Sequence, residues 1–323
     1  IVDLINHPGA EQIESFAEGK VKLVSVKAKK DGKLVNRELK SIKSDLPEID
    51  TFVPTIFRKN KPVVPDGSTV IKENDEVYFL SSEENIDKIV NELRDQGDTS
   101  SRIMIVGGGR IGLSLAMTLE KNYKVKVLEQ DHTKCESIAK DLNKAIVLKG
   151  SGSDEELLRS ENIENIDVFC ALTNDDETNI MSAFLAKKLG AKKTLIILNN
   201  YSYINILPKS FVDLPLSPQR MTVSLVMQHL TSVDMPQEVL LKMNSGVEAL
   251  EGVIHFNNDT KDLFGSKYVL LPLPENSVLG SIYRNGKNII PSDDLTIERD
   301  DHLIVFINGK TDKSQIEKLF KES

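Results

Sequence analysis

The chain has 323 residues, of which 40% are hydrophobic and 28% charged, and its formal net charge is -8. This length exceeds the roughly 250 to 300 residues at which a single core stops growing, so at least two domains are expected. The negative charge argues against nucleic acid as a partner, and the chain has neither a signal peptide nor an apolar run near the ~18 residues of a membrane span, so a cytosolic protein is expected.

The first hundred residues have the pattern of a helix followed by a β-rich module. Residues 1 to 16 are typical of a helix that breaks at Pro8-Gly9 and resumes over 10–16. Strand propensity and turn residues then predict strands at 21–27 and 51–57, an extended segment at 61–65, a strand at 76–80 and an amphipathic helix over 83–94. The polar, breaker-rich segment 96–101 indicates a domain boundary.

From Arg102 onward, short apolar strands alternate with helices. The predicted strands lie at 103–106, 125–128, 145–148, 168–172 and 194–198, and the helices at 113–121, 132–142, 154–161 and 177–189. Apolar runs of this length are typical of strands that are buried on both faces. The alternation predicts a doubly wound parallel sheet.

The first of these strands leads into Gly107, Gly109 and Gly112, at G-x-G-x-x-G spacing, and a helical pattern follows directly. At such a turn the first glycine permits the sharp bend, the second lets the backbone approach a pyrophosphate, and the third lets the helix pack on the strand. Glu129 ends the second strand, where a carboxylate would bind an adenosine ribose diol. A glycine-rich turn without a ligand has the same local sequence, but the two features together predict dinucleotide binding.

Small and polar residues also follow the third and fourth strands. Gly150 and Ser151 come after the third strand, and Thr173 and Asn174 come after the fourth. They belong to the polar segments 150–153 and 173–177. Ligands of doubly wound sheets lie at the carboxyl ends of the strands, so both segments lie where a ligand is expected. Turn chemistry or helix capping would explain each of them singly, whereas their convergence on one edge favours a site.

A helix predicted over 222–233 leads out of this region, and the rest of the chain is again β-rich, with a closing helix over 313–320. A shift of 226 positions places the first β-rich region on the second without a gap, so that Arg58 falls on Arg284 and Asp75 on Asp301. Two copies of one module therefore flank the glycine-rich region. Because a nucleotide domain precedes the second copy, another is expected to precede the first, and the chain is interpreted as a fragment.

The run 103–112, Glu129, the segment 171–179 and the duplicated module together resemble the TrkA family, the cytosolic nucleotide-binding regulatory subunits of bacterial Trk potassium uptake systems. The likeness covers nearly the whole chain, and 171–186 is its most specific segment. Members contain alternating regulator-of-potassium-conductance (RCK, or KTN) domains of N- and C-type, also named TrkA-N and TrkA-C. The implied order is a C-type α+β module with a preceding helix tail over 1–98, a Rossmann N-domain over 99–218, a connecting helix over 219–235 and a second C-type module over 236–323, without the first N-domain.

The resemblance also implies a ligand and partners. The ligand would be NAD, as NADH or NAD+, with ATP or ADP as alternatives. The chain would form a homo-oligomer, from a dimer to a tetrameric ring, at the inner face of the cell membrane beneath a membrane-embedded Trk-type potassium transporter. Carried over residue by residue, the pyrophosphate would be held by Gly107, Gly108, Gly109, Arg110, Ile111 and Gly112. Glu129 would bind the adenosine ribose, Gly150 and Ser151 would lie at the adenosine end, and Thr173 and Asn174 would approach the distal ribose or nicotinamide.

Two positions depart from the family pattern. Ser151 stands where relatives commonly have an aspartate after the glycine, and Ile197 stands where many have an arginine that reaches phosphates across a dimer. Both departures favour NAD(H) over ATP, and Glu129 would repel the 2′-phosphate of NADP.

Three functions are compatible with these features. A regulatory binding module would use the ligand to shift a transporter between states. An NAD-dependent oxidoreductase is the alternative, but hydride transfer needs an acid or base at the nicotinamide, and the five histidines are poorly placed for it. A structural subunit with a vestigial pocket is the third. No metal site is predicted, and Cys170 is expected to be a small buried hydrophobe, whereas the role of Cys135 stays open.

Overall fold

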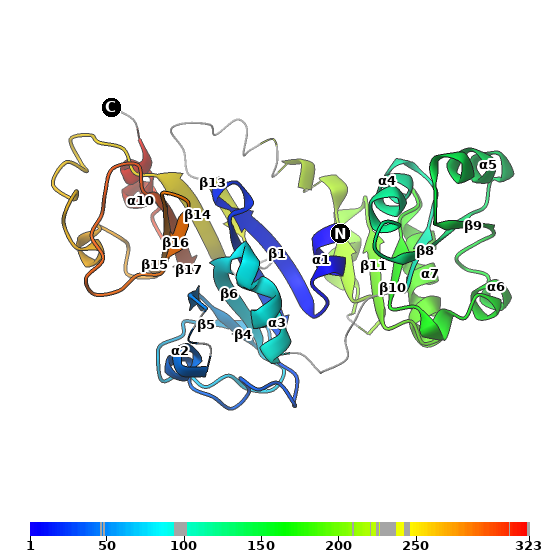
Figure 1. The fold of residues 1–323 in the computed structure, drawn as a ribbon, viewed down its shortest axis with the longest axis horizontal. Helices are drawn as coiled ribbons and strands as arrows, with labels where there is room; N and C mark the ends of the chain where they lie inside the picture. Colours follow the sequence, from blue (N-terminus) through cyan, green and yellow to red (C-terminus); the bar gives the residue numbers. More distant parts are fainter. Residues whose placement is uncertain are drawn as a thin grey trace. The chain divides into compact units, whose positions relative to one another are not determined.

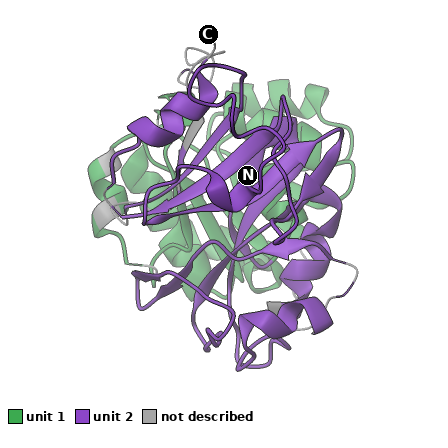
Figure 2. Cartoon of the chain, turned by 90° about the vertical axis from the view of Figure 1, so that its left-hand side faces the viewer, with its two compact units in different colours: residues 1–8, 99–223 green, residues 9–98, 224–323 purple. Residues whose placement is uncertain are grey.

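The computed structural model describes residues 1–45, 47, 49–93, 102–208, 210–219, 221–223, 226, 237–241, 246–309 and 311–321. The chain divides into two compact units, distinguished by colour in Figure 2. Unit 1 comprises residues 1–8 and 99–223, and unit 2 comprises residues 9–98 and 224–323. The two β-rich regions of the sequence thus belong to the same unit.

Unit 1 is built on one parallel sheet. Its strands are β7 (Arg102–Val106), β8 (Lys124–Glu129), β9 (Ile146–Lys149), β10 (Val168–Ala171), β11 (Lys193–Ile197) and β12 (Leu214–Leu216). Their spatial order is β12-β11-β10-β7-β8-β9, and every neighbouring pair is parallel. This is the strand order of the Rossmann fold, in which the chain reverses direction across the sheet between the first and fourth strands, here β7 and β10. The predicted doubly wound sheet is confirmed.

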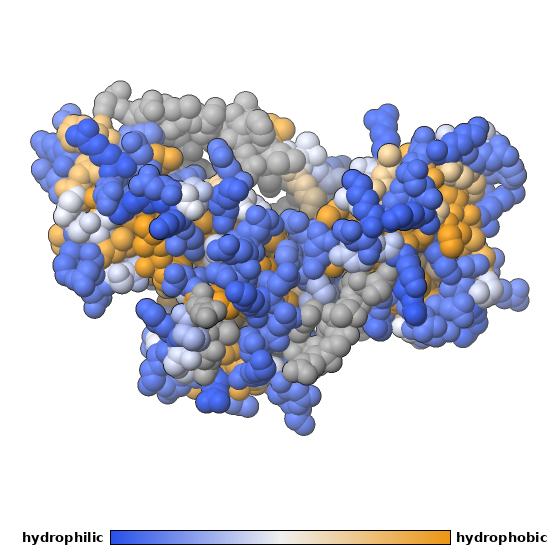
Figure 3. All heavy atoms as spheres, in the orientation of Figure 1, coloured by the Kyte–Doolittle hydropathy of each residue, from blue (hydrophilic) through white to orange (hydrophobic). Residues whose placement is uncertain are grey.

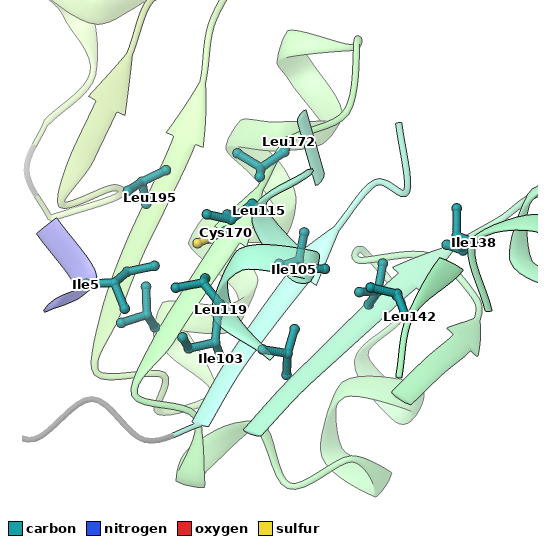
Figure 4. Close-up of a cluster of buried hydrophobic side chains, with 14 of the residues drawn as sticks. Ile5, Ile103, Ile105, Leu115, Leu119, Ile138, Leu142, Cys170, Leu172 and Leu195 are labelled. Carbon is teal, nitrogen blue, oxygen red and sulfur yellow. The ribbon is translucent and has the colours of Figure 1, made fainter. Parts of the chain in front are cut away.

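Helices cover both faces of this sheet (Figure 1). They are α1 (Val2–Asn6), α4 (Arg110–Leu119), α5 (His132–Asp141), α6 (Glu155–Ser160), α7 (Asp176–Lys188) and α8 (Tyr201–Ile206). Along β7, Ile103 and Ile105 pack with α1, α4 and α5, whereas Met104 and Val106 pack with α6, α7 and α8. Figure 4 shows the first of these two cores, which includes the buried Cys170. Each fully buried aliphatic side chain contributes roughly 1.5 to 3 kcal/mol, so the apolar strands hold both layers together.

Unit 2 contains two copies of one β-sheet module. The first has β1 (Ala10–Phe16), β2 (Val21–Lys27), β3 (Thr51–Phe52), β4 (Ile56–Arg58), β5 (Lys61–Val63), β6 (Glu76–Ser82), the short helix α2 (Ile42–Asp45) and the helix α3 (Ile86–Leu93). The second has β13 (Gln237–Leu240), β14 (Val247–Val253), β15 (Ser277–Arg284), β16 (Lys287–Ile289), β17 (His302–Asn308) and α10 (Ser314–Phe320). The sheet orders correspond, β1-β2-β6-β4-β5 with β13-β14-β17-β15-β16. The repeat predicted at a shift of 226 positions is confirmed, because β2, β5 and β6 fall on β14, β16 and β17 residue for residue.

An arginine and an aspartate form the same cluster of hydrogen bonds in both copies. Arg58 Nε and Nη2 donate to the two carboxylate oxygens of Asp75 at 2.9 and 2.7 Å, and the equivalent atoms of Arg284 donate to Asp301 at 2.6 and 2.7 Å. Each Nη2 also donates to a backbone carbonyl, that of Val70 or Thr296. The two carboxylates are 1% and 0% exposed as residues, so these bidentate pairs offset the cost of burying the charge.

The two modules share one hydrophobic cluster. Side chains from equivalent positions meet in it, among them Leu80 with Phe306 and Val21 with Val247, which lie 226 positions apart. Tyr78, whose hydroxyl donates to the carbonyl of Leu241 at 3.0 Å, joins the modules by a hydrogen bond as well. The same face of each copy is therefore buried against the other.

Two sequence predictions need correction. Residues 10–16 do not continue a helix but form β1, which pairs antiparallel with β2, so tertiary pairing overrides the helical pattern. The strand predicted over 51–57 is interrupted between β3 and β4, where Pro54 cannot donate to the sheet. The predicted boundary at 96–101 and most of the connecting helix 222–233 lie outside the described residues, and the predicted domain limits stay predictions.

One face of the described residues is drawn in Figure 3 by hydropathy. On the face drawn in Figure 3, hydrophilic residues (blue) cover most of the area, with apolar residues between them. Within the described ranges, no helix combines the length and apolar character needed to cross a bilayer.

Candidate functional site

A cavity of about 600 Å³ lies at the carboxyl ends of the central strands of unit 1, where the chain reverses direction between β7 and β10. This is where ligands of doubly wound sheets bind. The lining includes most of the predicted binding residues, namely Gly107, Gly109, Arg110, Ile111, Glu129, Gly150, Thr173 and Asn174. Gly108, Gly112 and Ser151 are not part of the lining.

The three glycines of the turn have three different surroundings. Gly107 adopts φ 99°, a left-handed conformation that favours glycine. A Cβ on Gly112 would lie 1.9 Å from the carbonyl oxygen of Gly107, so any side chain there would separate α4 from the turn. Gly109 is the N-cap of α4, and a Cβ on it would meet no protein atom within 4 Å. The space beside the second glycine is therefore open, next to the free N–H groups of a helix start, as a bound phosphate would require.

Glu129 is held at the tip of β8 by backbone donors. Its carboxylate accepts hydrogen bonds from the N–H of Gly108 at 2.9 Å and of Asp131 at 3.0 Å. Gly108 thus supports Glu129 from behind the cavity, and a Cβ on it would lie 2.6 Å from Ile138 Cδ1. The carboxylate is half-buried and lines the cavity, so its acceptor oxygens are fixed in position.

The two predicted residues after β9, Gly150 and Ser151, lie in different surroundings. Gly150 lines the cavity, and its N–H donates to the carbonyl of Glu129 at 2.9 Å. Ser151 instead accepts a hydrogen bond from the N–H of Ser153 at 3.1 Å, and its carbonyl accepts from Asp154. The structure therefore assigns Ser151 to the turn that leads into α6.

Residues of α7 hold the loops on the other side of the cavity. Asn179 is fully buried and makes hydrogen bonds to Thr173 and to the carbonyl of Ile197. Asp176 accepts from the N–H groups of Asn199 and Asn200, at 2.9 and 2.7 Å. Both α7 side chains thus fix loops that border the cavity without lining it themselves.

Several lining residues were not predicted from the sequence. They are Gln130, Lys134, Asp175, Thr178, Asn199 and Pro218, together with the apolar Val106, Leu128, Leu172 and Ile197. Lys134 brings a positive charge to the cavity from the first turn of α5, which Asp131 caps by accepting from Thr133 and Lys134. Lys134 could have been predicted, because it lies in the first turn of the helix that follows Glu129. Asn199 and Pro218 belong to segments that lie far from the glycine turn in the sequence and reach the cavity only in the folded chain.

Hydrogen bonds, burial and neighbouring charges shift the pKa values of three groups in and near the cavity. The N–H groups of Lys134 and Thr133 hold the pKa of Asp131 below its usual value, and hydrogen bonds from Thr178 do the same for the pKa of Asp175. Burial, followed by the charges of Glu129 and Asp131, raises the pKa of Cys135. The Sγ of Cys135 donates to the carbonyl of Glu129 at 3.3 Å.

Groups suited to metal or covalent chemistry are not gathered here. The described residues that line the cavity include no histidine and no cysteine. Within the described ranges, no cluster of three or more histidine, cysteine or acidic residues could hold a metal ion. The arrangement can bind an anionic group at the helix start and a hydroxyl-bearing group at Glu129.

Two features define the class to which this chain belongs. It combines a Rossmann sheet that has a glycine turn at its switch point with a duplicated small β-module. Models of two families match within these regions, the TrkA-N domain over residues 103–218 and the TrkA-C domain over residues 23–94. The chain is 41% identical over 320 residues to the Trk system potassium uptake protein TrkA of Vibrio alginolyticus, and 38% identical over 318 residues to that of Halomonas elongata. These matches cover 99% and 98% of this chain and 70% and 69% of the relatives. The chain belongs to the TrkA family.

Solved structures of the same fold are more distant in sequence. The RCK domain of GsuK aligns with 97% of this chain and 66% of its own, at a TM-score of 0.52 and 14% identity. The GsuK channel bound to NAD aligns with 98% of this chain and 55% of its own, at a TM-score of 0.51 and 14% identity. At this identity the likeness supports the fold.

Proposed function

We propose that this chain is a regulatory subunit of a potassium uptake system that binds NAD(H) in the cavity of unit 1 and couples its occupancy to the state of a membrane-embedded transporter. The observation that carries the proposal is the open space at Gly109, beside the start of α4 and within the same cavity as the fixed carboxylate of Glu129. A pyrophosphate and an adenosine ribose need these two groups together.

The proposed contacts divide the ligand into three parts. The pyrophosphate lies along residues 107–112, the adenosine ribose at Glu129 with Gly150 beside it, and the distal ribose and nicotinamide near Thr173 and Asn174. Lys134 adds a positive charge on the cavity wall, which favours an anionic ligand. The carboxylate of Glu129 would repel a 2′-phosphate, so NADP is disfavoured. ATP and ADP remain the alternative ligands.

Binding without turnover is the second element of the proposal. Hydride transfer needs an acid or base near the nicotinamide, and the described residues beside Thr173 and Asn174 offer the exposed Asp175, whose lowered pKa and helix-capping role suit it poorly. This favours a binding module over the alternative, an NAD-dependent oxidoreductase.

The transporter partner is proposed from the family. Relatives at 38 to 41% identity are named Trk system potassium uptake proteins, and we extend that role to this chain, as part of a homo-oligomer at the inner face of the membrane. A ligand that binds one state ten times more tightly shifts the equilibrium by about 1.4 kcal/mol per site. One or two altered hydrogen bonds in each cavity are therefore sufficient to regulate a transporter.

Isothermal titration of the purified chain with NADH, NAD+, NADPH, ATP and ADP tests the ligand. A Gly109→Asp variant should lose NADH affinity about a hundredfold, because its carboxylate would occupy the phosphate position. The variant should fold normally, since Gly109 has an extended backbone (φ -68°, ψ -174°) and open space around it. Gly67→Asp is the matched control in unit 2, at an exposed turn where the nearest atom to a Cβ is Lys40 Cβ at 3.5 Å. Unchanged NADH affinity in Gly109→Asp would refute the proposed site.

Two further measurements separate the other functions. Steady consumption of NADH in the presence of carbonyl substrates would favour the oxidoreductase. Potassium flux through a reconstituted Trk transporter should respond to NADH with the wild-type chain and not with Gly109→Asp. An identical flux with both proteins would contradict the regulatory role.

A further inference from the structure

The side chain of Asn179, in the first turns of α7, uses its whole hydrogen-bonding capacity on the two strand ends beside the cavity. Its Oδ1 accepts from the backbone N–H of Thr173 at 2.9 Å and from the Thr173 hydroxyl at 2.7 Å. Its Nδ2 donates to the carbonyl of Thr173 at 2.9 Å and to the carbonyl of Ile197 at 3.0 Å. An amide has two acceptor and two donor sites, and all four are occupied.

This amide is 0% exposed and does not line the cavity, whereas Thr173 and Ile197 do. Thr173 follows β10 and Ile197 ends β11, so one side chain fixes the relative position of two neighbouring strand ends. Oδ1 and Nδ2 cannot exchange places. In the flipped amide, the NH2 group would face the N–H of Thr173, donor against donor, and Oδ1 would face two carbonyl oxygens, acceptor against acceptor. Asn179 therefore sets where the backbone and hydroxyl of Thr173 lie.

The loop that Asn179 fixes packs directly against the glycine turn. A Cβ on Gly107 would lie 3.0 Å from the backbone N of Thr173 and 3.1 Å from the carbonyl group of Leu172. The turn itself is held independently, by the N–H of Gly107 donating to the carbonyl of Leu128 and by the contact between Gly112 and Gly107. The two halves meet, since the N–H of Leu172 also donates to the carbonyl of Val106 at 2.8 Å, but the side-chain support of the Thr173 side comes from α7, whereas β8 and α4 support the phosphate and adenosine side.

We infer that Asn179 is a positioning residue that gives the cavity its preference for a dinucleotide over a nucleoside diphosphate. The inference rests on the proposed function. A dinucleotide extends past the pyrophosphate to the loop at Thr173, whereas ADP ends at the glycine turn. Loosening the loop therefore weakens contacts that only the dinucleotide makes, and the contacts common to both ligands persist because they depend on Gly107, Gly109 and Glu129.

Asn179→Ser is the first test variant, because it removes the bridging amide without adding a charge and leaves room for water at the freed groups. Asn179→Asp is the second, since it keeps the acceptor and the shape and loses the two donated hydrogen bonds. Asp167→Asn is the matched control for folding. Asp167 is also buried and accepts from a backbone N–H, that of Arg102 at 2.9 Å, but at the amino ends of β7 and β10, the opposite edge of the sheet.

The measurement is the affinity of each protein for NADH, followed by its fluorescence, and for ADP, followed by displacement of bound NADH, with thermal unfolding alongside. We expect an about tenfold loss of affinity for NADH and a less than twofold loss for ADP in both Asn179 variants, so that the ratio of the two affinities changes about five- to tenfold, or about 1.0 to 1.4 kcal/mol. Asp167→Asn should lower the unfolding temperature and leave the ratio of the two affinities unchanged.

Each other outcome overturns the inference in a recognisable way. If NADH and ADP weaken equally in whichever Asn179 variant folds, Asn179 supports the fold alone. If neither affinity changes, the loop does not contact the ligand. If the wild-type chain binds neither nucleotide, the proposed function fails together with the inference.

Discussion

Carboxylates in unit 2 and polar side chains at the cavity of unit 1 differ in whether the protein itself uses all of their hydrogen-bonding capacity. In unit 2, Asp75 and Asp301 are buried, and arginine and backbone donors from the same module surround their carboxylates. At the cavity of unit 1, Glu129 accepts two backbone hydrogen bonds and still lines open space, and Asn174 is an exposed residue of the same lining. A buried polar group satisfied by its own module stabilises the fold, whereas fixed polar groups around a cavity are available to a ligand. Substitutions in the two regions should therefore affect different measurements.

The largest loss of stability is expected for Asp301→Asn. The change removes the buried carboxylate partner of Arg284, whose side chain is 15% exposed, and leaves it paired with Glu298, which is exposed. Removing one partner of a buried pair costs about 3 to 5 kcal/mol. Asp75→Asn should cost less, since the side chain of Arg58 is 30% exposed and can be hydrated. Urea unfolding measures both, and NADH affinity should stay unchanged. A change in NADH affinity would contradict the separation of the two regions.

Gly112→Ala should cause the next largest loss of stability, about 3 kcal/mol, which is at the upper end of the cost of adding carbon atoms to a well-packed site. Its Cβ would overlap the carbonyl oxygen of Gly107, so the substitution should lower both the unfolding temperature and NADH affinity. Ser114→Ala, at an exposed position of the same helix, is the control and should change neither. Normal stability of the Gly112 variant would show that α4 can shift away from the turn.

Glu120 belongs to unit 1, but it should stabilise the fold in the way that the buried carboxylates of unit 2 do. It is 6% exposed, and hydrogen bonds from the N–H groups of Lys144, Ala145 and Asn143 lower its pKa to about 2, from an ordinary value of 4.5. Because the folded pKa is depressed, its contribution is complete above pH 4.5 and disappears as the pH falls toward 2.

Glu120→Gln should therefore cost roughly 2 kcal/mol at pH 7 and almost nothing near pH 2. Urea unfolding of the variant and the wild type across this range tests the expectation. A difference in stability that does not depend on pH would show that the charge of Glu120 is not involved.

The smallest effect on stability, below about 1 kcal/mol, is expected for Glu129→Gln, because the amide oxygen can still accept one of the two backbone hydrogen bonds. NADH affinity should nevertheless fall about tenfold, and the preference for NADH over NADPH should narrow as the repulsive charge disappears. Titration with both nucleotides measures this. An unchanged NADH to NADPH ratio would exclude Glu129 from the adenosine ribose.

Local signals made much of the site predictable. Gly107, Gly109 and Gly112 were recognised because a strand, a turn and a helix start follow one another within eleven residues, 102–112. Asn179 and Asn199 were not assigned a role, because their positions depend on hydrogen bonds between α7 and the ends of β10 and β11 that no spacing encodes.

The errors in the fold have the same origin. A helix was predicted in place of the strand β1. Its partner strand β2 follows a turn at Ala17, Glu18 and Gly19, and the positive φ angles of these residues could not be predicted from the sequence. The strand β12 was missed because Pro215 discourages a strand assignment, yet proline is tolerated in an edge strand, and β12 is at the edge of its sheet.

The shared cluster that joins the two β-modules has a consequence for dilute protein. Both partners belong to one polypeptide, so their association is unimolecular, and tethering replaces the concentration dependence of an ordinary dimer with an effective local concentration on the order of millimolar. Dilution to nanomolar levels should leave this pairing intact, even under conditions that separate one chain from another.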